Sequence, residues 1–418
     1  MEIEIGRGKK ARRAFGFDDI AIVPSRRTRD PDEVDISWKL GDYRFELPLL
    51  ASAMDGVVSP TTAGIVGRLG GLAVLNLEGI WTRYEDADAE LARIARLPRE
   101  RATRAMQEIY REPIKAELIE RRIREIKAEG VVVAASLTPQ RVRRYYEAAL
   151  EAGLDVLVIQ GTVVSAEHVS ERSEPLNLKA FTRTVGVPVV VGGCASYSTG
   201  LHLMRTGAAA VLVGVGPGEA CTTRGVLGIG VPQATAIADV AAARSQHMLE
   251  TGEYVKVIAD GGMRRGGDVS KAIACGADAV MIGSPLARAH EAPGHGFHWG
   301  MATFHPTLPR GARVQTVQNG TLEEIITGPA RENDGTFNLM GALRTSMATC
   351  GYKDIAEFNR AELLIAPSLQ TEGKALQTAQ GIGMYARGDG AAAPASEDGE
   401  GSAPTDGREA EEPALVGA

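Results

Sequence analysis

Eight short apolar runs recur between Pro48 and Ser284, and stretches with helical spacing separate them. The runs are rich in Val, Ile, Leu and Ala and barely alternate with polar residues, as is typical of parallel strands buried on both faces. Intervening stretches such as 141–153 and 198–207 end in glycine, a common helix C-terminal signal. The runs occupy residues 48–52, 70–76, 131–136, 155–161, 188–193, 209–214, 255–262 and 278–284.

Eight consecutive strand–helix units predict an α/β fold, a single (β/α)8 TIM barrel. A doubly wound parallel sheet is the alternative, and the count of eight together with the chain length favours the barrel. In a barrel, functional side chains lie where the strands end. The runs end in small or polar residues, namely Ser52, Asn76, Ser136, Gln160, Cys194, Gly214, Asp260 and Ser284.

Three segments fall outside the repeat. Residues 77–130 form a long, charged connection that is predicted to be helical, and an irregular stretch within about 285–330 is predicted to be a mobile flap. Residues 388–418 consist mainly of Ala, Gly, Pro, Ser and acids, which cannot bury enough apolar surface to fold. We therefore expect a barrel domain over 1–387, including the flap and a C-terminal extension, followed by a disordered acidic tail.

The charge of the chain is uneven. The tail holds eight acids and one base, Arg408, so it accounts for the whole formal net charge of −7. The near-neutral body argues against nucleic acid as a partner, and the basic residues at 6–13 are interpreted as a solvated arm. No apolar run approaches the roughly 20 residues of a membrane span, and the N-terminus lacks a signal-peptide core. We expect a cytoplasmic protein with no membrane partner.

The four cysteines form no CxxC pair, which argues against a disulfide framework or a structural zinc site. Cys221 stands apart because it lies in the glycine-rich loop 213–225, just after the sixth run. A thiolate there could attack an electrophilic carbon and divide one difficult displacement into two easier steps. Thr223 could assist by hydrogen bonding or by accepting a proton from water. The alternative is a buried structural cysteine.

The seventh and eighth runs end in "IADGG" (258–262) and "IGS" (282–284). Bare glycine amides at adjacent strand ends bind phosphate, and barrels often place a phosphate site there. Asp260 could accept hydrogen bonds from both hydroxyls of a ribose. The alternative interpretation is a pair of tight turns with a helix N-cap.

Several motifs occur in the order found in one family. They are "SAMD" (52–55), "GVGPGEACTTR" (214–224), "GVPQATAI" (230–237), "IADGGMRRGGD" (258–268), "MIGS" (281–284), "EAPG" (291–294) and "QTEG" (370–373). Over roughly residues 15–385 the chain resembles the IMP dehydrogenase/GMP reductase family, specifically its short dehydrogenase-like branch without CBS domains. The connection 77–130 stands where longer dehydrogenases insert those domains.

The resemblance implies that Cys221 attacks C2 of the purine of IMP, with Thr223 as its helper. Hydride then passes to NAD, a covalent thioimidate forms, and water releases XMP. His298 stands where the family usually has a tyrosine. The positions implied to contact the substrate are Ser52, Met54, Asp260, Gly262, Gly283, Ser284, His298, Gly300 and Met301.

The resemblance also implies a cofactor site and a K⁺ site. The expected cofactor positions are Thr138, Gln160, Gly161, Thr162 and Gly214. The expected monovalent-cation ligands are Gly214, Gly216 and the Cys221 carbonyl, joined by Glu372 and Gly373 of a neighbouring subunit. A homotetramer is therefore expected, with an octamer as the alternative. Lys374 follows the last motif, and its ammonium group could replace the cation.

Some positions depart from the family pattern. Glu219 stands where the family has a serine that touches phosphate, so we expect its carboxylate to turn toward solvent or a basic group. The flap lacks the family's Arg-Tyr pair, which leaves Arg310 and Arg313 as candidates to activate water, or as ordinary surface residues. An arginine needs help from burial or a partner to act as a base, and Thr223 is the natural candidate.

Three functions compete. Asn319 stands where the reductase has an essential glutamate, which favours an NAD-dependent IMP dehydrogenase over an NADPH-dependent GMP reductase. A catalytically silent regulatory protein that binds purine nucleotides is the third possibility. The presence of Cys221, Thr223 and Asp260 argues against a protein that has lost catalytic activity.

Overall fold

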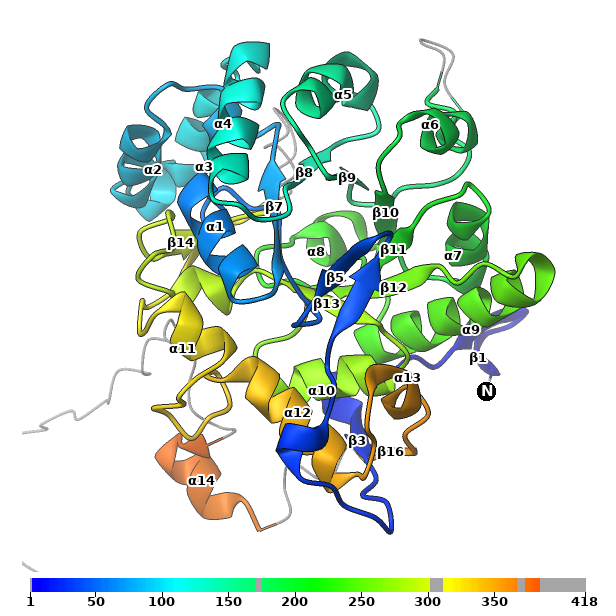
Figure 1. The fold of residues 1–418 in the computed structure, drawn as a ribbon. Helices are drawn as coiled ribbons and strands as arrows, with labels where there is room; N and C mark the ends of the chain where they lie inside the picture. Colours follow the sequence, from blue (N-terminus) through cyan, green and yellow to red (C-terminus); the bar gives the residue numbers. More distant parts are fainter. Residues whose placement is uncertain (1, 170–174, 301–310, 367–372, 384–418) are drawn as a thin grey trace, which may run out of the picture.

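The structure, a computed structural model of the single chain, describes residues 2–169, 175–300, 311–366 and 373–383. Eight parallel strands close into a barrel in which each strand pairs with its neighbours in the sequence, and the last pairs with the first (Figure 1). The closure confirms the predicted (β/α)8 barrel and rules out a doubly wound sheet. The strands are β6 Leu49–Ala51, β7 Leu72–Asn76, β8 Ala134–Leu137, β9 Val156–Gln160, β10 Val189–Cys194, β11 Ala210–Val213, β12 Lys256–Asp260 and β13 Ala279–Ile282.

Helices surround the barrel and cover its strands (Figure 1). Nearly every strand residue is buried, as the unbroken apolar runs predicted. The helices in the strand-to-strand connections are α1 Pro60–Arg68, α2 Ala87–Ala95, α3 Arg99–Ile109, α4 Ala116–Ala128, α5 Val142–Glu151, α6 Leu178–Thr184, α7 Tyr197–Met204, α8 Thr223–Leu227, α9 Gln233–Thr251 and α10 Gly266–Ala274. Local sequence fixes where they begin: at α1, the Ser59 hydroxyl accepts a hydrogen bond from the Thr62 amide, and Pro60 occupies the first turn.

The charged connection 77–130 is helical, as predicted. It contains the short 3-10 helix η3 Ile80–Thr82 followed by α2, α3 and α4. The inner faces of these helices are buried against the barrel, whereas their outer faces carry the charged residues. Within the described ranges, the chain therefore contains a small helical subdomain at this position and no CBS domain.

The C-terminal extension begins with the stem of the flap, an antiparallel pair formed by β14 Phe297–His298 and β15 Val314–Gln315. Residues 301–310, which join these two strands, lie outside the described chain, and so does the tail 388–418. The predicted mobility of the flap and the disorder of the tail therefore stay predictions. The remaining helices of the extension are α11 Leu322–Ile326, α12 Leu339–Thr349, α13 Ile355–Phe358 and α14 Ala375–Gln380.

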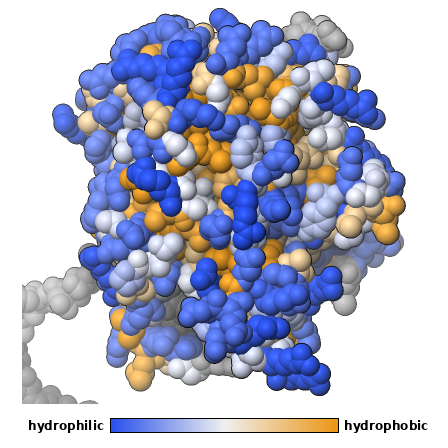
Figure 2. All heavy atoms as spheres, viewed as in Figure 1, coloured by the Kyte–Doolittle hydropathy of each residue, from blue (hydrophilic) through white to orange (hydrophobic). Residues whose placement is uncertain are grey.

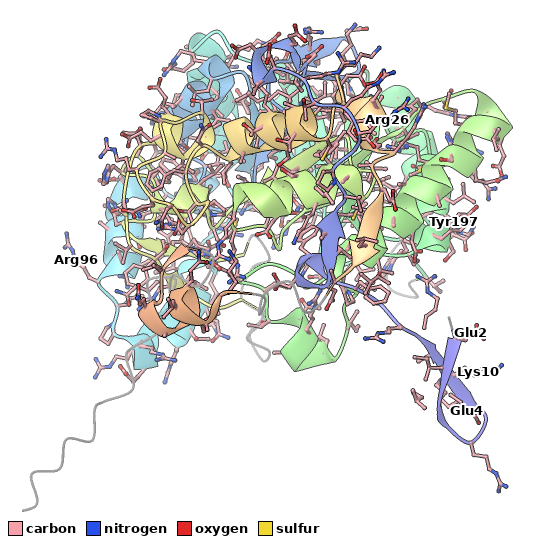
Figure 3. The ribbon with its side chains drawn as sticks, turned by 90° about the horizontal axis from the view of Figure 1, so that it is seen from below. Glu2, Glu4, Lys10, Arg26, Arg96 and Tyr197 are labelled. Atoms are coloured by element: carbon pink, nitrogen blue, oxygen red, sulfur yellow. The ribbon has the colours of Figure 1, made fainter. Side chains whose placement is uncertain are left out.

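A two-stranded hairpin at the N-terminus, β1 Glu2–Gly6 with β2 Lys9–Arg12, extends away from the rest of the molecule (Figure 3). Two further antiparallel pairs lie outside the barrel: β3 Ile20–Ile22 pairs with β16 Leu363–Ile365, far along the chain, and β4 Trp38–Leu40 forms a hairpin with β5 Tyr43–Phe45. The short 3-10 helices η1 Phe17–Asp19, η2 Pro31–Glu33 and η4 Leu286–Arg288 complete the fold.

Hydrophilic residues cover most of the face shown in Figure 2, with apolar residues visible between them. Across the described residues, no helix combines the length and the apolar character that crossing a membrane requires.

Candidate active site

A cavity of about 950 Å³ opens where the barrel strands end. Seven of the eight strand ends contribute a lining residue, so the cavity lies at the barrel face where the sequence placed it. Its lining includes most of the predicted site residues, namely Ser52, Met54, Thr138, Gln160, Gly161, Thr162, Gly214, Gly216, Cys221, Thr223, Asp260, Gly262, Gly283, Ser284 and Gly300. Met301, Arg310 and Glu372 fall outside the part of the chain that the structure describes.

Cys221 is the one partly exposed cysteine of the four. Its thiol donates a hydrogen bond to the Thr223 hydroxyl, with 3.2 Å between Sγ and Oγ1. The other three are buried, and burial raises the pKa of Cys194 and of Cys275 to about 12 each, which makes them inert. Only Cys221 therefore combines access to the cavity with a hydroxyl partner.

The loop that carries Cys221 is held on two sides. At Gly214, a Cβ atom would lie 2.1 Å from the Asp260 carbonyl oxygen, so only glycine allows the loop to approach β12. The Gln233 amide donates to the same carbonyl and to that of Val213. On the other side, Cys221 forms an isolated antiparallel bridge with Gly311, at the returning end of the flap. Cys221 is thus fixed between the barrel and the flap.

Asp260 lies at the end of β12, on the wall of the cavity. Burial raises the pKa of its carboxyl group to about 7, and a hydrogen bond from the Gln160 amide partly offsets this effect. The Gln160 Nε2 to Asp260 Oδ2 distance is 3.0 Å. Gln160, expected at the cofactor, therefore also contacts the residue expected at the ribose.

The strand ends of β12 and β13 form a corner lined by glycines. Gly262 has φ = +81°, and a Cβ atom at Gly283 would lie 2.5 Å from the Met54 sulfur. The positive φ favours glycine at position 262, and a side chain at position 283 would displace Met54. Both residues line the cavity, at the strand ends where a phosphate site is expected.

Three side chains complete this corner. His298 is fully buried, and its Nε2 lies 2.9 Å from Ser284 Oγ and 4.0 Å from Glu219 Oε2. Burial lowers the pKa of His298, while the Glu219 carboxylate raises it. Glu219 faces the His298 imidazole rather than an arginine or lysine. That group lies at the predicted phosphate position, however, so the carboxylate stays at the corner.

Glu78 and Arg141 line the other end of the cavity, and sequence reasoning missed both. Glu78 is buried and accepts a 2.6 Å hydrogen bond from the Thr138 amide. Arg141 Nε lies 3.3 Å from Glu78 Oε2. The one sequence feature that could have pointed to them is their position, since each follows a predicted strand by a few residues. Together they fix Thr138 where the cofactor is expected.

Arg313 follows Gly311, the bridge partner of Cys221, by two residues, but it is not among the described residues that line the cavity of Cys221. Its guanidinium group donates to the carbonyls of Ile94 and Leu97 and stacks over the Phe297 ring at 4.3 Å. Burial lowers the pKa of Arg313. These contacts fasten the flap stem to the end of α2, and they engage the guanidinium in structural bonds.

A second link joins the flap to the helical connection. The Trp299 indole donates to the Tyr110 hydroxyl, which in turn donates to the Asp55 carboxylate. All three residues are buried, and burial raises the pKa of Asp55 to about 6.

Asn319 lies in a second cavity of about 950 Å³ that adjoins the first. Its side-chain oxygen accepts a 3.2 Å hydrogen bond from Arg288. The two cavities share Glu219, Arg264 and Ser284 in their linings. Gly373 and Lys374 are absent from the described lining of either cavity.

The fold and site are those of a closed (β/α)8 barrel with a partly exposed cysteine at its strand-end cavity. The model of the IMP dehydrogenase / GMP reductase domain matches residues 14–374. The chain therefore belongs to the IMP dehydrogenase/GMP reductase family and is an oxidoreductase of that family, as the motifs indicated.

Relatives agree with this assignment. An uncharacterized oxidoreductase of Mycolicibacterium smegmatis is 46% identical over 87% of this chain and 99% of its own length. The inosine-5′-monophosphate dehydrogenase of Methanocaldococcus jannaschii is 27% identical over 87% of this chain and 95% of its own length. A crystal structure of an IMP dehydrogenase/GMP reductase-like protein from Corynebacterium glutamicum superposes with a TM-score of 0.83 at 44% identity, covering 87% of this chain and 97% of that one.

Proposed function

We propose that the protein is an NAD-dependent IMP dehydrogenase, which converts IMP, NAD⁺ and water into XMP, NADH and a proton. The observation that carries this proposal is the Cys221–Thr223 pair on the wall of a cavity that also holds Asp260 and the glycine corner. In this proposal, Cys221 is the nucleophile, Asp260 accepts from the ribose, and the glycine corner takes the phosphate, and all three line one cavity. That arrangement suits a purine nucleotide with C2 near the thiol.

The chemistry follows from the positions of these groups. The Cys221 thiolate adds to C2 of the hypoxanthine ring, and the hydrogen on C2 leaves as hydride. Thr138 and Gly161, which line the cavity, would hold NAD⁺, and its nicotinamide ring would supply the acceptor for that hydride. The resulting thioimidate at Cys221 is attacked by water at C2, the thiolate leaves, and XMP is released.

Water activation needs a group close to the thioimidate. The Thr223 hydroxyl is hydrogen-bonded to the Cys221 thiol. It can therefore orient the attacking water or accept a proton from that water. The Arg313 guanidinium is occupied by two carbonyls, which favours Thr223 for this step. Arg310 stays a candidate from the sequence alone.

A GMP reductase is the second candidate, because the same family contains both activities. Asn319 disfavours it. Asn319 stands in place of the reductase glutamate, lies in the second cavity, and bonds to Arg288 rather than facing Cys221.

Two assays separate the candidates. Purified protein is mixed with IMP and NAD⁺, and separately with GMP and NADPH, while nicotinamide absorbance is followed. Growth of signal only in the first assay supports the dehydrogenase, and decay only in the second supports the reductase. Silence in both, with nucleotide still bound, supports a regulatory protein. Cys221→Ala must abolish turnover, whereas Cys350→Ala, at a buried cysteine away from the cavity, should retain it.

Cation dependence tests a further part of the proposal. Gly214, Gly216 and the Cys221 carbonyl are proposed to hold K⁺ together with Glu372 and Gly373 of a neighbouring subunit in a homotetramer. If the Lys374 ammonium replaces the ion, activity is insensitive to added K⁺. A strong rise in activity with K⁺ contradicts the replacement and supports a bound cation.

A further inference from the structure

The second cavity is rich in arginine. Its lining holds five arginines and three acids, which leaves an excess of two positive charges. At about 950 Å³ it is as large as the first cavity and falls within the size range of ligand sites. The charged residues are Arg99, Arg264, Arg265, Arg288, Arg313, Glu219, Glu332 and Asp334.

The two cavities meet at the corner proposed for the 5′-phosphate. Glu219, Arg264 and Ser284 line both of them. A nucleotide whose base lies at Cys221 and whose phosphate lies at Ser284 therefore points its phosphate toward the arginine-rich cavity. Any group attached beyond that phosphate would enter it.

Glu219 makes the corner a poor place for a terminal phosphate. A phosphate monoester carries a charge of about −1.5 to −2 at pH 7. The Glu219 carboxylate lies 4.0 Å from His298, and burial keeps that imidazole toward its neutral form. The negative charge of a terminal phosphate at this corner would therefore be repelled by the Glu219 carboxylate. The inner phosphate of a diphosphate has only one ionisable oxygen. It carries less charge and is repelled less.

The arginines of the second cavity suit the terminal phosphate of such a diphosphate. Guanidinium groups bind phosphate oxygens in bidentate pairs, and such charge-assisted bonds are stronger than neutral ones. Arg288 bonds to Asn319, so the protein positions it at this cavity. Arg313 contributes positive charge, while two carbonyls hold its guanidinium group. Arg99 and Arg265 line the second cavity and not the first, which makes them the residues for a selective test.

We propose that the second cavity is a subsite for the terminal phosphate of a purine nucleoside 5′-diphosphate, so that IDP binds more tightly than IMP. The proposal rests on the proposed function, because it takes the base and first phosphate to lie as they do for IMP. It adds a ligand class that the dehydrogenase reaction does not require.

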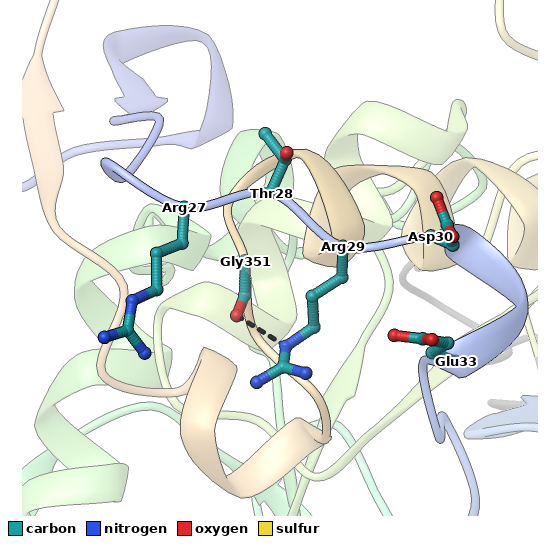
Figure 4. A pocket seen from close by; sticks show the side chains of 6 residues that line it. All are labelled: Arg27, Thr28, Arg29, Asp30, Glu33 and Gly351. Carbon is teal, nitrogen blue, oxygen red and sulfur yellow. Dashed lines mark hydrogen bonds between the residues drawn. The ribbon is translucent and has the colours of Figure 1, made fainter.

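Calorimetric titration of the full chain with inosine, IMP and IDP tests the subsite. We expect IDP to bind about tenfold more tightly than IMP, since one charge-assisted hydrogen bond can supply that factor. In the double variant Arg99→Ala/Arg265→Ala, IDP affinity falls about tenfold while IMP affinity stays within about twofold. Arg27→Ala is the matched control, because Arg27 lies in a separate depression that shares no lining residue with either cavity (Figure 4).

Glu219→Gln provides a second test that does not depend on the arginine variants. Removing the carboxylate should strengthen IMP binding more than IDP binding, so the ratio of IDP affinity to IMP affinity should fall. If IMP binds and turns over but IDP binds no more tightly than IMP, the subsite is overturned and the proposed function is not. Failure of both nucleotides to bind overturns the proposed function, and the subsite with it. An equal loss for both nucleotides in the double variant also contradicts the subsite.

Discussion

Thr223 is the side chain whose role can be separated most cleanly from that of Cys221. Thr223→Val keeps the shape but removes the hydroxyl that contacts the thiol. If this hydroxyl acts on water, hydrolysis slows by about a hundredfold while hydride transfer persists, so NADH should appear in a burst followed by a slow phase. Rapid-mixing absorbance measures both phases, with Thr223→Ser as the control that keeps the hydroxyl. Equal loss of burst and steady rate would place Thr223 in the first step instead.

Asp260 predicts a pH dependence. Its pKa is raised to about 7, so the group is largely protonated at pH 6 and ionised at pH 8. The ionised carboxylate accepts hydrogen bonds from the ribose hydroxyls more strongly, because charge-assisted bonds are the stronger kind. We expect kcat/KM for IMP to rise with pH through about 7 and to level off above about 8, whereas Asp260→Asn gives a lower, flatter profile. A wild-type profile that falls over this range contradicts the role.

Single residues differed in how far the sequence could place them. Asp260 and the glycine corner could be predicted because they lie at strand ends, which converge in a barrel. Cys221 could be predicted because it lies in the glycine-rich loop that follows β11. Glu78 and Arg141 were missed because their importance comes from pairing with each other across two loops. The engagement of Arg313 depends on carbonyls some 220 residues earlier in the chain, which no local pattern reveals.

The flap stem and the helical connection behave as one unit in this fold. Tyr110 on the connection bonds to Trp299 beyond β14 and to Asp55 beyond β6, with all three buried. Tyr110→Phe leaves the indole and the carboxylate without this partner, so the free energy of unfolding should fall by about 1–3 kcal/mol. Urea denaturation measures the change. Tyr146→Phe, which removes an exposed bond to Glu147, should change it by less than about 0.5 kcal/mol.

The elements with strong periodicity were predicted well, and the short polar ones were not. The eight strands and the helical connection are confirmed because long buried runs and repeated helical spacing leave few alternatives. The N-terminal hairpin was interpreted as a solvated arm, yet Lys9–Arg12 forms β2. Its pairing with β1 depends on contacts between two polar segments, which carry little burial signal.

The projecting hairpin bears on the assembly of the whole protein. An isolated two-stranded hairpin is marginally stable in water, and this one projects from the body (Figure 3). Its residues Ile3 and Ile5 are exposed. We therefore expect it to contact a second copy in the proposed homotetramer. Light scattering should show smaller assemblies for Ile3→Ser/Ile5→Ser than for wild type. Lys10→Ser, on the opposite strand, is the control. A monomeric wild type, or unchanged assembly in the double variant, contradicts this expectation.

The covalent intermediate on Cys221 is what distinguishes the proposed dehydrogenase from a protein that merely binds nucleotides. The deciding measurement is mass spectrometry of wild type quenched in acid during turnover with IMP and NAD⁺. We predict a purine nucleotide attached to the peptide that contains Cys221, formed only when NAD⁺ is present and absent from Cys221→Ala. NADH production with no adduct on that peptide, or an adduct on another cysteine, would contradict the mechanism.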